Sequence, residues 1–543
     1  MELTALGSPA ERGRPRIRSS RRTERGHVVK RSRMVRSAAS AVVLGGLLAT
    51  ATATAGSAAP LAVPGSIETV AGVSGSRDLW ACGWDGRGVD VALVDTGVSP
   101  VAGTGTIVNG PDLSFDAQTG GVAYLDGFGH GTHLASIING HDPGVAVTGG
   151  CRYNADGTVA STPTPTATGY AGVAPGARVV NVKVGAVDGA VDVTQVLAAI
   201  DWVVQHRNTD GFNIRVLALA YGSASTSDAK HDALSHAVAV ARQNGIVVVA
   251  SSGNDGTSHT DLAFPAGNPD VVAVGAADTH GSSKAADWTV ATFADRGSKD
   301  RPIDVIVPGI DIQGLRVPGS YIDSLAPTTT GDRFERGSGT SQTAAVVAGL
   351  AAQLVQRYPT ATPDQIKATL EKGAAPVQSG GGSWSQGSGG IVARQLLKAG
   401  PTNAKTTPLV TIGDAPLTSD RQDQTVAIDG IALTGNVDVM GHPWKPTWAT
   451  GASTSSTWQL GRWNGSRFAG DVMGPTGWAT AAWATSWAGT PWPTVDGPAG
   501  TWDGLRWNGL RWNGLRWNGL RWNGTGWDGL RWNGLRWNAI SWT

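Results

Sequence analysis

Three polar residues of this chain have the types that a hydrolytic site needs, and each stands beside glycines. Asp95 ends the apolar run "VALVD", His130 lies in "GFGHGTH", and Ser341 lies in "GSGTSQTAA". A serine hydroxyl becomes a nucleophile when a base removes its proton, and a histidine can do this near neutral pH. A buried aspartate holds such a histidine in the required tautomer. The three residues together therefore predict nucleophilic attack on a carbonyl carbon.

Each of the three residues also has an ordinary structural interpretation. Serine is a favoured helix N-cap, because its side-chain oxygen accepts a hydrogen bond from a backbone N–H at the helix start. Asp95 could begin a turn, and His130 could cap a helix. Ser341 taken alone is better explained as a cap than as a nucleophile. The presence of all three residues favours catalysis, and we expect Ser341 to serve both as the cap and as the nucleophile.

The segments around these residues predict the sheet that positions them. Runs that are apolar on both faces, as in a buried parallel sheet, occur at residues 89–94, 178–184, 214–220, 246–251 and 271–275. Amphipathic, helix-like segments lie near residues 191–206, 228–243 and 341–357. This alternation predicts an α/β domain with a mainly parallel central sheet and helices on both faces. Ligand sites in such sheets lie beyond the carboxyl ends of the strands.

Seven segments, in order, resemble those of the subtilisin-like serine proteases, which are called subtilases or the peptidase S8 family. They are "DTG", "HGTH", "GVAPGARVVNVKV", "VVVASSGNDG", "FPAGNPDVVAVGAAD", "DVIVPGIDIQ" and "GTS". The resemblance covers roughly residues 77–400 and implies a three-layer α/β/α fold. It also implies a serine endopeptidase in which Asp95 orients His130, His130 acts as general base and then acid, and Ser341 attacks the carbonyl carbon.

The resemblance also implies an oxyanion donor. Asn254, in "SSGNDG", stands where the family has the amide that binds the developing oxyanion together with the backbone N–H of Ser341. The alternative is structural, because Asn-Asp-Gly is a common turn. The position of Asn254 after a buried strand, within a matched segment, favours the catalytic role.

Two further segments resemble the edges that bind an extended peptide substrate. The segment "LALAYG" resembles the strand that pairs with the substrate and forms a wall of the specificity pocket. Its candidate residues are Leu219, Ala220, Tyr221 and Gly222. The segment "DGAV", with Gly189, resembles the opposite edge. Substrate would lie between the two edges and be held by backbone hydrogen bonds.

The chain departs from the family after the nucleophile. The family usually continues Met-Ala-x-Pro after "GTS", whereas this chain has Gln342, Thr343, Ala344 and Ala345. The missing proline concerns the start of the helix and removes no catalytic group. The implied chemistry requires no cofactor. Calcium often stabilises members of the family, so structural calcium is an open expectation to which the sequence assigns no ligands.

The N-terminus has the pattern of a secretory signal. The first 36 residues carry eleven Lys or Arg and three acidic residues, and the uncharged "SAASAVVLGGLLATATATAGSAAP" follows. A basic region, an apolar region and small residues in this order predict export and removal of residues 1–55. The apolar stretch is short for a membrane span, and no other stretch is long and apolar enough. Removal would leave 32 basic and 39 acidic residues, a net charge of −7.

The two cysteines fit an exported protein. An even pair in an oxidising compartment predicts one disulfide, between Cys82 and Cys151. Two separate buried thiols are the alternative.

Composition divides the chain into parts. They are a signal (1–55), a short N-terminal segment (56–76), the peptidase domain (77–400), a linker or small β segment (401–450) and a Trp-rich region (451–543). The short N-terminal segment offers too little sequence for the folding pro-domain that is usual in the family.

The Trp-rich region repeats with a period of five. From Trp502 to Trp542 a tryptophan recurs at every fifth residue, mostly in the unit "LRWNG". A period of five fits neither a helix nor a flat strand, and Asn-Gly favours turns. The region is therefore a turn-rich repeat or a segment that orders on binding.

The residues between the tryptophans make the repeats cationic. Six Arg stand against two Asp from residue 501 onward. Charge and indole rings together predict contact with a cell wall or another anionic surface, and no nucleic acid is expected. The alternatives are a small self-packed, turn-rich module that protects the C-terminus, or contact with the acidic catalytic domain of the same chain. A non-catalytic surface-binding protein that uses the subtilase fold as a scaffold is the alternative to a secreted peptidase that cleaves proteins or peptides.

Overall fold

The computed structural model describes residues 65–401, with gaps, and parts of the chain beyond them. The gaps are residues 119–121, 146–149, 155–158, 163–168, 257–259, 326–332 and 379–381. Beyond residue 401 the described residues are 404, 407–422, 427–428, 431–432, 435–439, 443–444, 458–459, 462–463, 522–523, 526–527, 531–532, 535–537 and 541–542. The predicted signal, residues 1–55, and most of the Trp-rich region lie outside the described residues.

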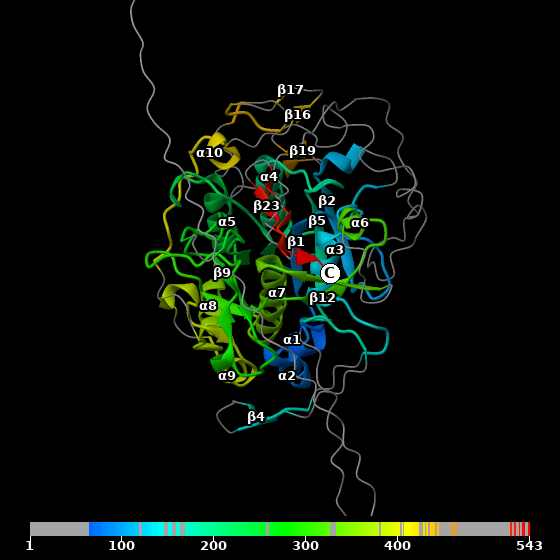
Figure 1. The fold of residues 1–543 in the computed structure, drawn as a ribbon, viewed down its shortest axis with the longest axis vertical. Coiled ribbons are helices and arrows are strands. Elements are labelled where there is room, and N and C mark those ends of the chain that lie inside the picture. The colour runs from blue at the N-terminus through cyan, green and yellow to red at the C-terminus, as the bar shows by residue number, and fades with distance from the viewer. Residues whose placement is uncertain are drawn as a thin grey trace, which may run out of the picture. The chain divides into compact units, whose positions relative to one another are not determined.

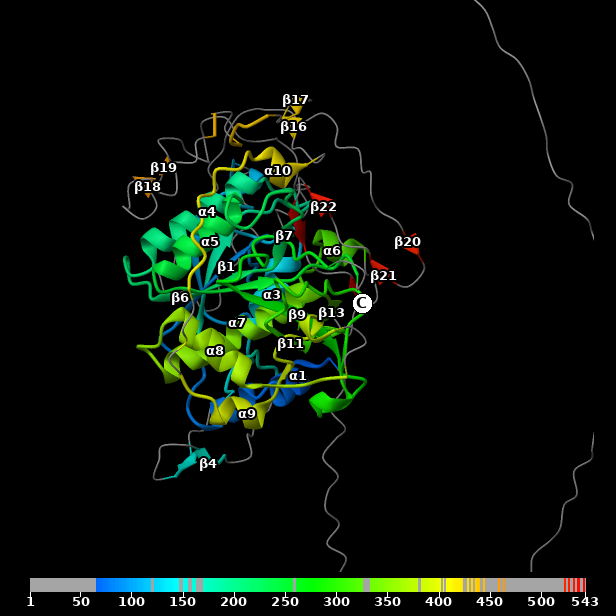
Figure 2. The same cartoon turned by 90° about the vertical axis from the view of Figure 1, so that its left-hand side faces the viewer.

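A ten-stranded sheet forms the centre of the fold (Figures 1 and 2). Its strands lie in the order β14 (Ala374–Ala375), β15 (Gly390–Ile391), β11 (Val305–Pro308), β9 (Val272–Asp278), β8 (Val247–Ser251), β6 (Ile214–Leu219), β1 (Asp90–Asp95), β5 (Arg178–Lys183) and β2 (Ile107–Asp112), with β10 (Thr289–Val290) paired to β9. All neighbours from β15 to β2 run parallel, whereas β14 and β10 pair antiparallel. The predicted mainly parallel sheet is confirmed.

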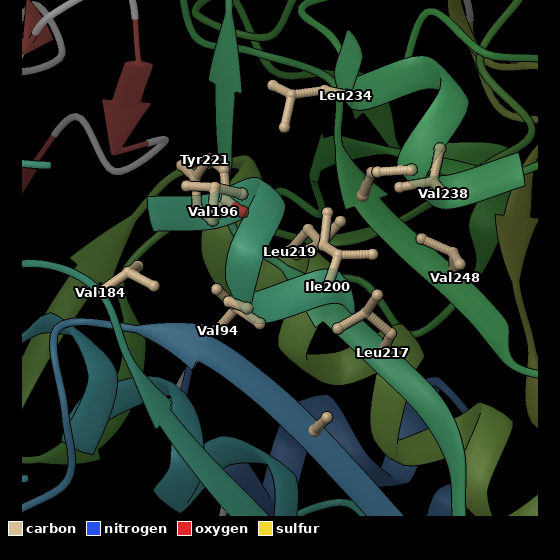
Figure 3. Packing of buried hydrophobic residues seen from close by; sticks show 14 of the residues in the cluster. Val94, Val184, Val196, Ile200, Leu217, Leu219, Tyr221, Leu234, Val238 and Val248 are labelled. Atoms are coloured by element: carbon tan, nitrogen blue, oxygen red, sulfur yellow. The ribbon is translucent and has the colours of Figure 1, made fainter. Parts of the chain in front are cut away.

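Helices cover both faces of this sheet. They are α4 (Val193–His206) and α5 (Ala233–Gln243) on one face, and α3 (His130–Asn139), α7 (Thr340–Arg357) and α8 (Pro363–Lys372) on the other. Successive side chains of a strand point to opposite faces. Accordingly, Val94 packs with the α4 face and Leu93 with the α7 face. Figure 3 shows Val196 and Ile200 of α4 beside Val94 of β1. The result is the predicted three-layer α/β/α fold.

Shorter elements complete the described chain. The helices are α1 (Ile67–Val73), α2 (Ser76–Ala81), α6 (Tyr321–Leu325), α9 (Ala393–Lys398), α10 (Thr418–Arg421), η1 (Phe115–Gln118), η2 (Ala285–Asp287) and η3 (Ser383–Ser385). The strands are β3 (Arg152–Tyr153), β4 (Val159–Ser161), β7 (Tyr221–Ser223), β12 (Ile312–Leu315), β13 (Phe334–Ser338), β16 (Ala427–Ile428) and β17 (Ile431–Ala432). No described helix has the length and apolar character that crossing a membrane requires.

A disulfide joins Cys82 to Cys151, with 4.8 Å between the two Cα atoms. Cys82 ends α2, and Cys151 directly precedes β3. The bond therefore ties the start of the described chain to the segment that follows α3. This is the pairing that the count of two cysteines in an exported chain predicts.

The segment after residue 401 packs on the α/β domain. Arg421 is buried and makes a two-point ion pair with Asp192, the N-cap of α4, at 2.7 and 2.9 Å. The same guanidinium donates to the carbonyl oxygens of Gly435 and Val437. Breaking such a buried pair typically costs about 3–5 kcal/mol. The described part of residues 407–444 is thus held to the helix layer by a buried charge.

The described parts of the Trp-rich region form short antiparallel strand pairs. These strands are β18 (Trp458–Gln459), β19 (Arg462–Trp463), β20 (Trp522–Asn523), β21 (Gly526–Trp527), β22 (Arg531–Trp532), β23 (Leu535–Trp537) and β24 (Ser541–Trp542). β18 pairs with β19, β20 with β21, and β22 with β23. Each pair joins neighbouring segments of the chain, as hairpins do.

Candidate active site

Asp95 and His130 meet at the carboxyl end of the central strand β1. Asp95 is the last residue of β1, and His130 is the first residue of α3. The Nδ1 atom of His130 lies 2.8 Å from Oδ1 of Asp95 and 3.0 Å from Oδ2, and both side chains are buried. An ionised carboxylate can only accept, so Nδ1 carries the proton of a neutral imidazole. The Nε2 atom is then the basic nitrogen.

The close contact between β1 and α3 depends on a glycine after His130. A Cβ atom on Gly131 would lie 2.2 Å from the carbonyl oxygen of Gly97 and 3.0 Å from Oδ1 of Asp95. Contacts below about 3 Å do not occur without movement of one partner. The glycine in "HGTH" therefore lets the histidine helix approach the aspartate.

A second buried carboxylate, Asp126, holds the start of α3. It accepts hydrogen bonds from the backbone N–H of Gly129 and of Thr132, both at 2.7 Å, and from the Thr96 hydroxyl at 2.8 Å. Burial raises the pKa of Asp126, while these hydrogen bonds lower it. The first N–H groups of a helix have no acceptor within the helix, and the Asp126 side chain is the acceptor for two of them at the start of α3. Sequence reasoning missed this residue, although an Asp-Gly pair three residues before a glycine is a recognisable turn signal.

Ser341 lies in the first turn of α7. The helix starts at Thr340, and its N-cap is Gly339, which has no side chain to cap it. The hydroxyl of Ser341 donates instead to the carbonyl oxygen of Ala220, at 2.8 Å. The prediction that Ser341 caps the helix is therefore wrong, because the helix begins one residue before it. Its hydroxyl is held at the end of β6, whose neighbour in the sheet is β1.

Asn254 contacts the residue before Ser341. Its Oδ1 atom accepts from the backbone N–H of Thr340 at 3.1 Å and from the Thr340 hydroxyl at 3.0 Å. This fixes the orientation of the amide, because only the oxygen can accept. The Nδ2 group of Asn254 is buried and has no hydrogen-bond partner among the described residues. A buried donor without a partner is unusual and needs an explanation, and a ligand oxygen would supply one.

Asp295 supports the turn that carries Asn254. Its Oδ1 atom accepts from the N–H of Asp255 at 2.7 Å, and its own N–H donates to the carbonyl oxygen of Gly253. Gly253 has a φ of 118°, and a Cβ atom there would lie 2.0 Å from Oδ2 of Asp295. Burial raises the pKa of Asp295 to about 8. Sequence reasoning missed Asp295, since nothing local links it to Asn254.

The predicted substrate edge lies beside Ser341. Leu219 ends β6, Ala220 follows it, and Tyr221 and Gly222 begin β7. The side chains of Leu219, Ala220 and Tyr221 are buried, and Figure 3 shows Leu219 and Tyr221 within the packed cluster. A Cβ atom on Gly222 would lie 2.4 Å from that of Ala263. Contact of this edge with a peptide would therefore use the backbone.

Gly189 lies in the tight turn that follows β5. Its N–H donates to the carbonyl oxygen of Ala186 at 2.8 Å, and Ala190 accepts from the N–H of Ala186 at 3.0 Å. The φ of Gly189 is 84°, a region that favours glycine. Its neighbour Asp188 has a pKa raised to about 8 by burial.

Lys183, the last residue of β5, is buried and forms an ion pair with the buried Asp116. The Nζ atom of Lys183 lies 2.9 Å from Oδ2 of Asp116 and donates to the carbonyl oxygen of Leu125 at 2.5 Å. Burial lowers the pKa of Lys183, but Asp116 and Asp112 raise it above its ordinary value. No group of three or more His, Cys, Asp or Glu residues in the described chain could hold a metal ion. We therefore assign no calcium site to these residues.

The chain is similar in sequence to one protein family and to several of its characterised members. The sequence profile of the Subtilase family matches residues 86–389. The chain is 31% identical over 303 residues to "Serine protease AprX" of Bacillus subtilis, covering 53% of this chain and 61% of that protein. It is 30% identical over 304 residues to "Subtilisin BL" of Lederbergia lenta, covering 55% and 87%.

Two further proteins are similar over a comparable part of the chain. "Fervidolysin" of Fervidobacterium pennivorans is 30% identical over 348 residues, covering 60% of this chain and 42% of that protein. The chain thus spans less than two thirds of AprX and of fervidolysin. A solved structure of a cold-adapted subtilisin-like serine proteinase is 25% identical and covers 57% of this chain and 90% of its own, with a TM-score of 0.41.

Proposed function

The chain belongs to the subtilase family, and from that premise we propose that it is a secreted serine endopeptidase that hydrolyses peptide bonds in proteins or peptides. The observation that carries the proposal is the buried hydrogen bond between Asp95 and Nδ1 of His130. That bond leaves Nε2 as the base. A scaffold that only binds a surface would have no use for it.

The proposed reaction starts at Ser341. The hydroxyl turns from the carbonyl of Ala220 to Nε2 of His130, which takes the proton as Oγ bonds to the carbonyl carbon of the substrate. The C=O electron pair moves onto oxygen and forms the oxyanion. Asp95 stabilises the imidazolium but does not itself take the proton.

Two donors are proposed for the oxyanion. One is the backbone N–H of Ser341, which belongs to the first turn of α7 and so has no helical partner. The other is the buried Nδ2 group of Asn254. The positive end of the α7 dipole also favours the negative charge. Both donors are in place before the reaction, so little reorganisation is needed.

The acyl-enzyme follows when the oxyanion collapses. His130 gives its proton to the leaving amine, and the C–N bond breaks. Water then attacks the ester, with His130 as base, and the acid product leaves with Ser341 restored. Apart from substrate and water, every group in these steps belongs to the protein, so we propose no cofactor for the chemistry.

Hydrolysis of casein by the purified protein tests the proposal. Wild-type protein should release peptides, and Ser341→Ala should lower kcat about 10⁶-fold, as in a subtilisin. Thr343→Ala is the matched control, because Thr343 lies two residues further along α7 and donates to the carbonyl of Thr340. Equal hydrolysis by wild-type and Ser341→Ala protein would contradict the proposed function.

We propose further that residues 1–55 direct export and that the Trp-rich region, residues 451–543, retains part of the enzyme at the cell wall. Both segments lie wholly or largely outside the described residues, and the support is their composition. N-terminal sequencing of protein from the medium should begin near residue 56. Deletion of residues 451–543 should release the enzyme from wall material without loss of peptide hydrolysis. Equal partition of the two forms between wall and medium would contradict the anchor.

A further inference from the structure

The last two strands that the structure describes pair with two strands that lie on either side of Ser341. β23 (Leu535–Trp537) runs antiparallel to β7 (Tyr221–Ser223), with Arg536 opposite Gly222. β24 (Ser541–Trp542) runs antiparallel to β13 (Phe334–Ser338). Strand β23, drawn in red, lies near the middle of Figure 1, and in the three-stranded sheet it lies between β22 and β7, which Figure 2 labels.

In both pairs, the strand of the α/β domain has one end close to Ser341. The carbonyl of Ala220, which accepts from the Ser341 hydroxyl, directly precedes β7, and Trp537 is opposite Tyr221 at that end of the strand. β13 ends three residues before Ser341, and Ser541 is opposite its last residue, Ser338. Both edges that β23 and β24 occupy therefore end close to Ser341 in the chain or in space.

β7 has one edge available for such a peptide. At Ser223 its other edge is bridged to Phe264, with N–H to O distances of 2.8 Å in both directions. β23 takes the remaining edge and is itself paired to β22 (Arg531–Trp532), which gives a three-stranded sheet. Addition of a strand to a sheet edge is a common mode of peptide binding, in which the backbone supplies the affinity.

We propose that the C-terminal segment that carries strands β23 (Leu535–Trp537) and β24 (Ser541–Trp542) is an intramolecular ligand of the β7 and β13 edges that competes with substrate. The role of these edges in substrate binding rests on the proposed function. A ligand tethered to its own site acts at an effective concentration that can reach millimolar. Peptide substrates must displace it, so the segment raises the apparent KM and leaves kcat unchanged.

A proline in β23 tests this competition in the full-length protein. Proline has no N–H and is excluded from the middle of paired strands. Arg536→Pro should lower the KM for a short chromogenic peptide, and so raise kcat/KM about tenfold, because tethered ligands act at high effective concentration. Arg511→Pro is the matched control, since Arg511 lies in the same local sequence, Leu-Arg-Trp-Asn, outside the described residues. Intact mass should verify that each protein retains its C-terminus.

Hydrogen exchange in the Ser341→Ala background gives a readout that does not need activity. Arg536→Pro should increase amide exchange at Tyr221–Ser223, and Arg511→Pro should not. Unchanged exchange at β7 in Arg536→Pro, or an equal increase in both variants, overturns the inference. If exchange responds as expected but no form hydrolyses peptide, the strand pairing stands and the proposed function fails.

Discussion

The starts of α3 and α7 carry the two reacting side chains and are stabilised in different ways. Both helices follow a glycine, and neither N-cap makes a side-chain hydrogen bond. At α3 the carboxylate of Asp126 accepts the free N–H groups. At α7 a neutral amide, Asn254, accepts only from Thr340.

The difference follows from where negative charge develops. The α3 helix presents a base that becomes a cation, so a nearby carboxylate does no harm to the reaction. The α7 helix presents the nucleophile beside the oxyanion, and a carboxylate there would repel it and occupy its donors. The amide oxygen of Asn254 holds the helix start while its Nδ2 group stays available. The helix start thus finds its acceptor in a carboxyl group at α3 and in a neutral amide oxygen at α7.

Asn254→Ala should produce the larger effect on catalysis. Loss of one oxyanion donor should lower kcat by about 10²–10³, as in a subtilisin, with little change in KM. Steady-state kinetics on a short peptide would measure it, with Asn268→Ala as a control for loss of a buried asparagine outside the site. A rise in KM with unchanged kcat would instead show that Asn254 acts in substrate binding.

Asp126→Ala should act mainly on stability. It leaves two buried N–H groups without their acceptor, which should lower the free energy of unfolding by about 1–3 kcal/mol. Urea denaturation would measure the change. In protein that is still folded, kcat should fall less than in Asn254→Ala. If Asp126→Ala instead abolishes activity without loss of stability, the proposed contrast between the two helices is wrong.

The smallest effect is expected from Asp295→Asn, and it depends on pH. Burial raises the pKa of Asp295 to about 8, so the folded protein holds a proton that the unfolded chain releases near the ordinary pKa of 3.8. The contribution of the Asp295 carboxyl to the free energy of unfolding is therefore present at low pH and is lost as the pH rises toward and through 8. Asn keeps an acceptor for Asp255 and cannot ionise.

Melting curves between pH 5 and 9, a range chosen to bracket the pKa of about 8, would test this. The wild-type melting temperature should fall more steeply with pH than that of Asp295→Asn. Parallel curves for the two proteins would show that Asp295 does not titrate in this range.

The sequence predicts the core of the fold and misses parts whose signal is weak or distant. Five strands have continuous apolar runs, whereas β2 contains Asn109, Gly110 and Pro111 and has only Ile107 fully buried. Such a strand shows neither alternation nor an apolar run. It is specified by its pairing with β5 rather than by its own residues.

Prediction of the active site from the sequence has the same limit. Asp95, His130, Asn254 and Ser341 stand in recognisable motifs. Asp295, by contrast, meets the Asn254 turn only after the chain has folded, because the two are far apart in sequence. The capping role expected of Ser341 fails since local preference cannot tell the N-cap from the residue two positions later. Local patterns therefore find the reacting groups, and tertiary contacts decide how each one is held.

Labelling with a fluorophosphonate probe tests the central claim most directly. Such a probe reacts with a serine hydroxyl that a neighbouring base activates, and peptide mass spectrometry identifies the labelled residue. Wild-type protein should be labelled at Ser341, and His130→Ala, confirmed as folded by circular dichroism, should not be labelled. Labelling of Ser341 that persists in His130→Ala, or the absence of any label in folded wild-type protein, would contradict activation of Ser341 by the Asp95–His130 pair.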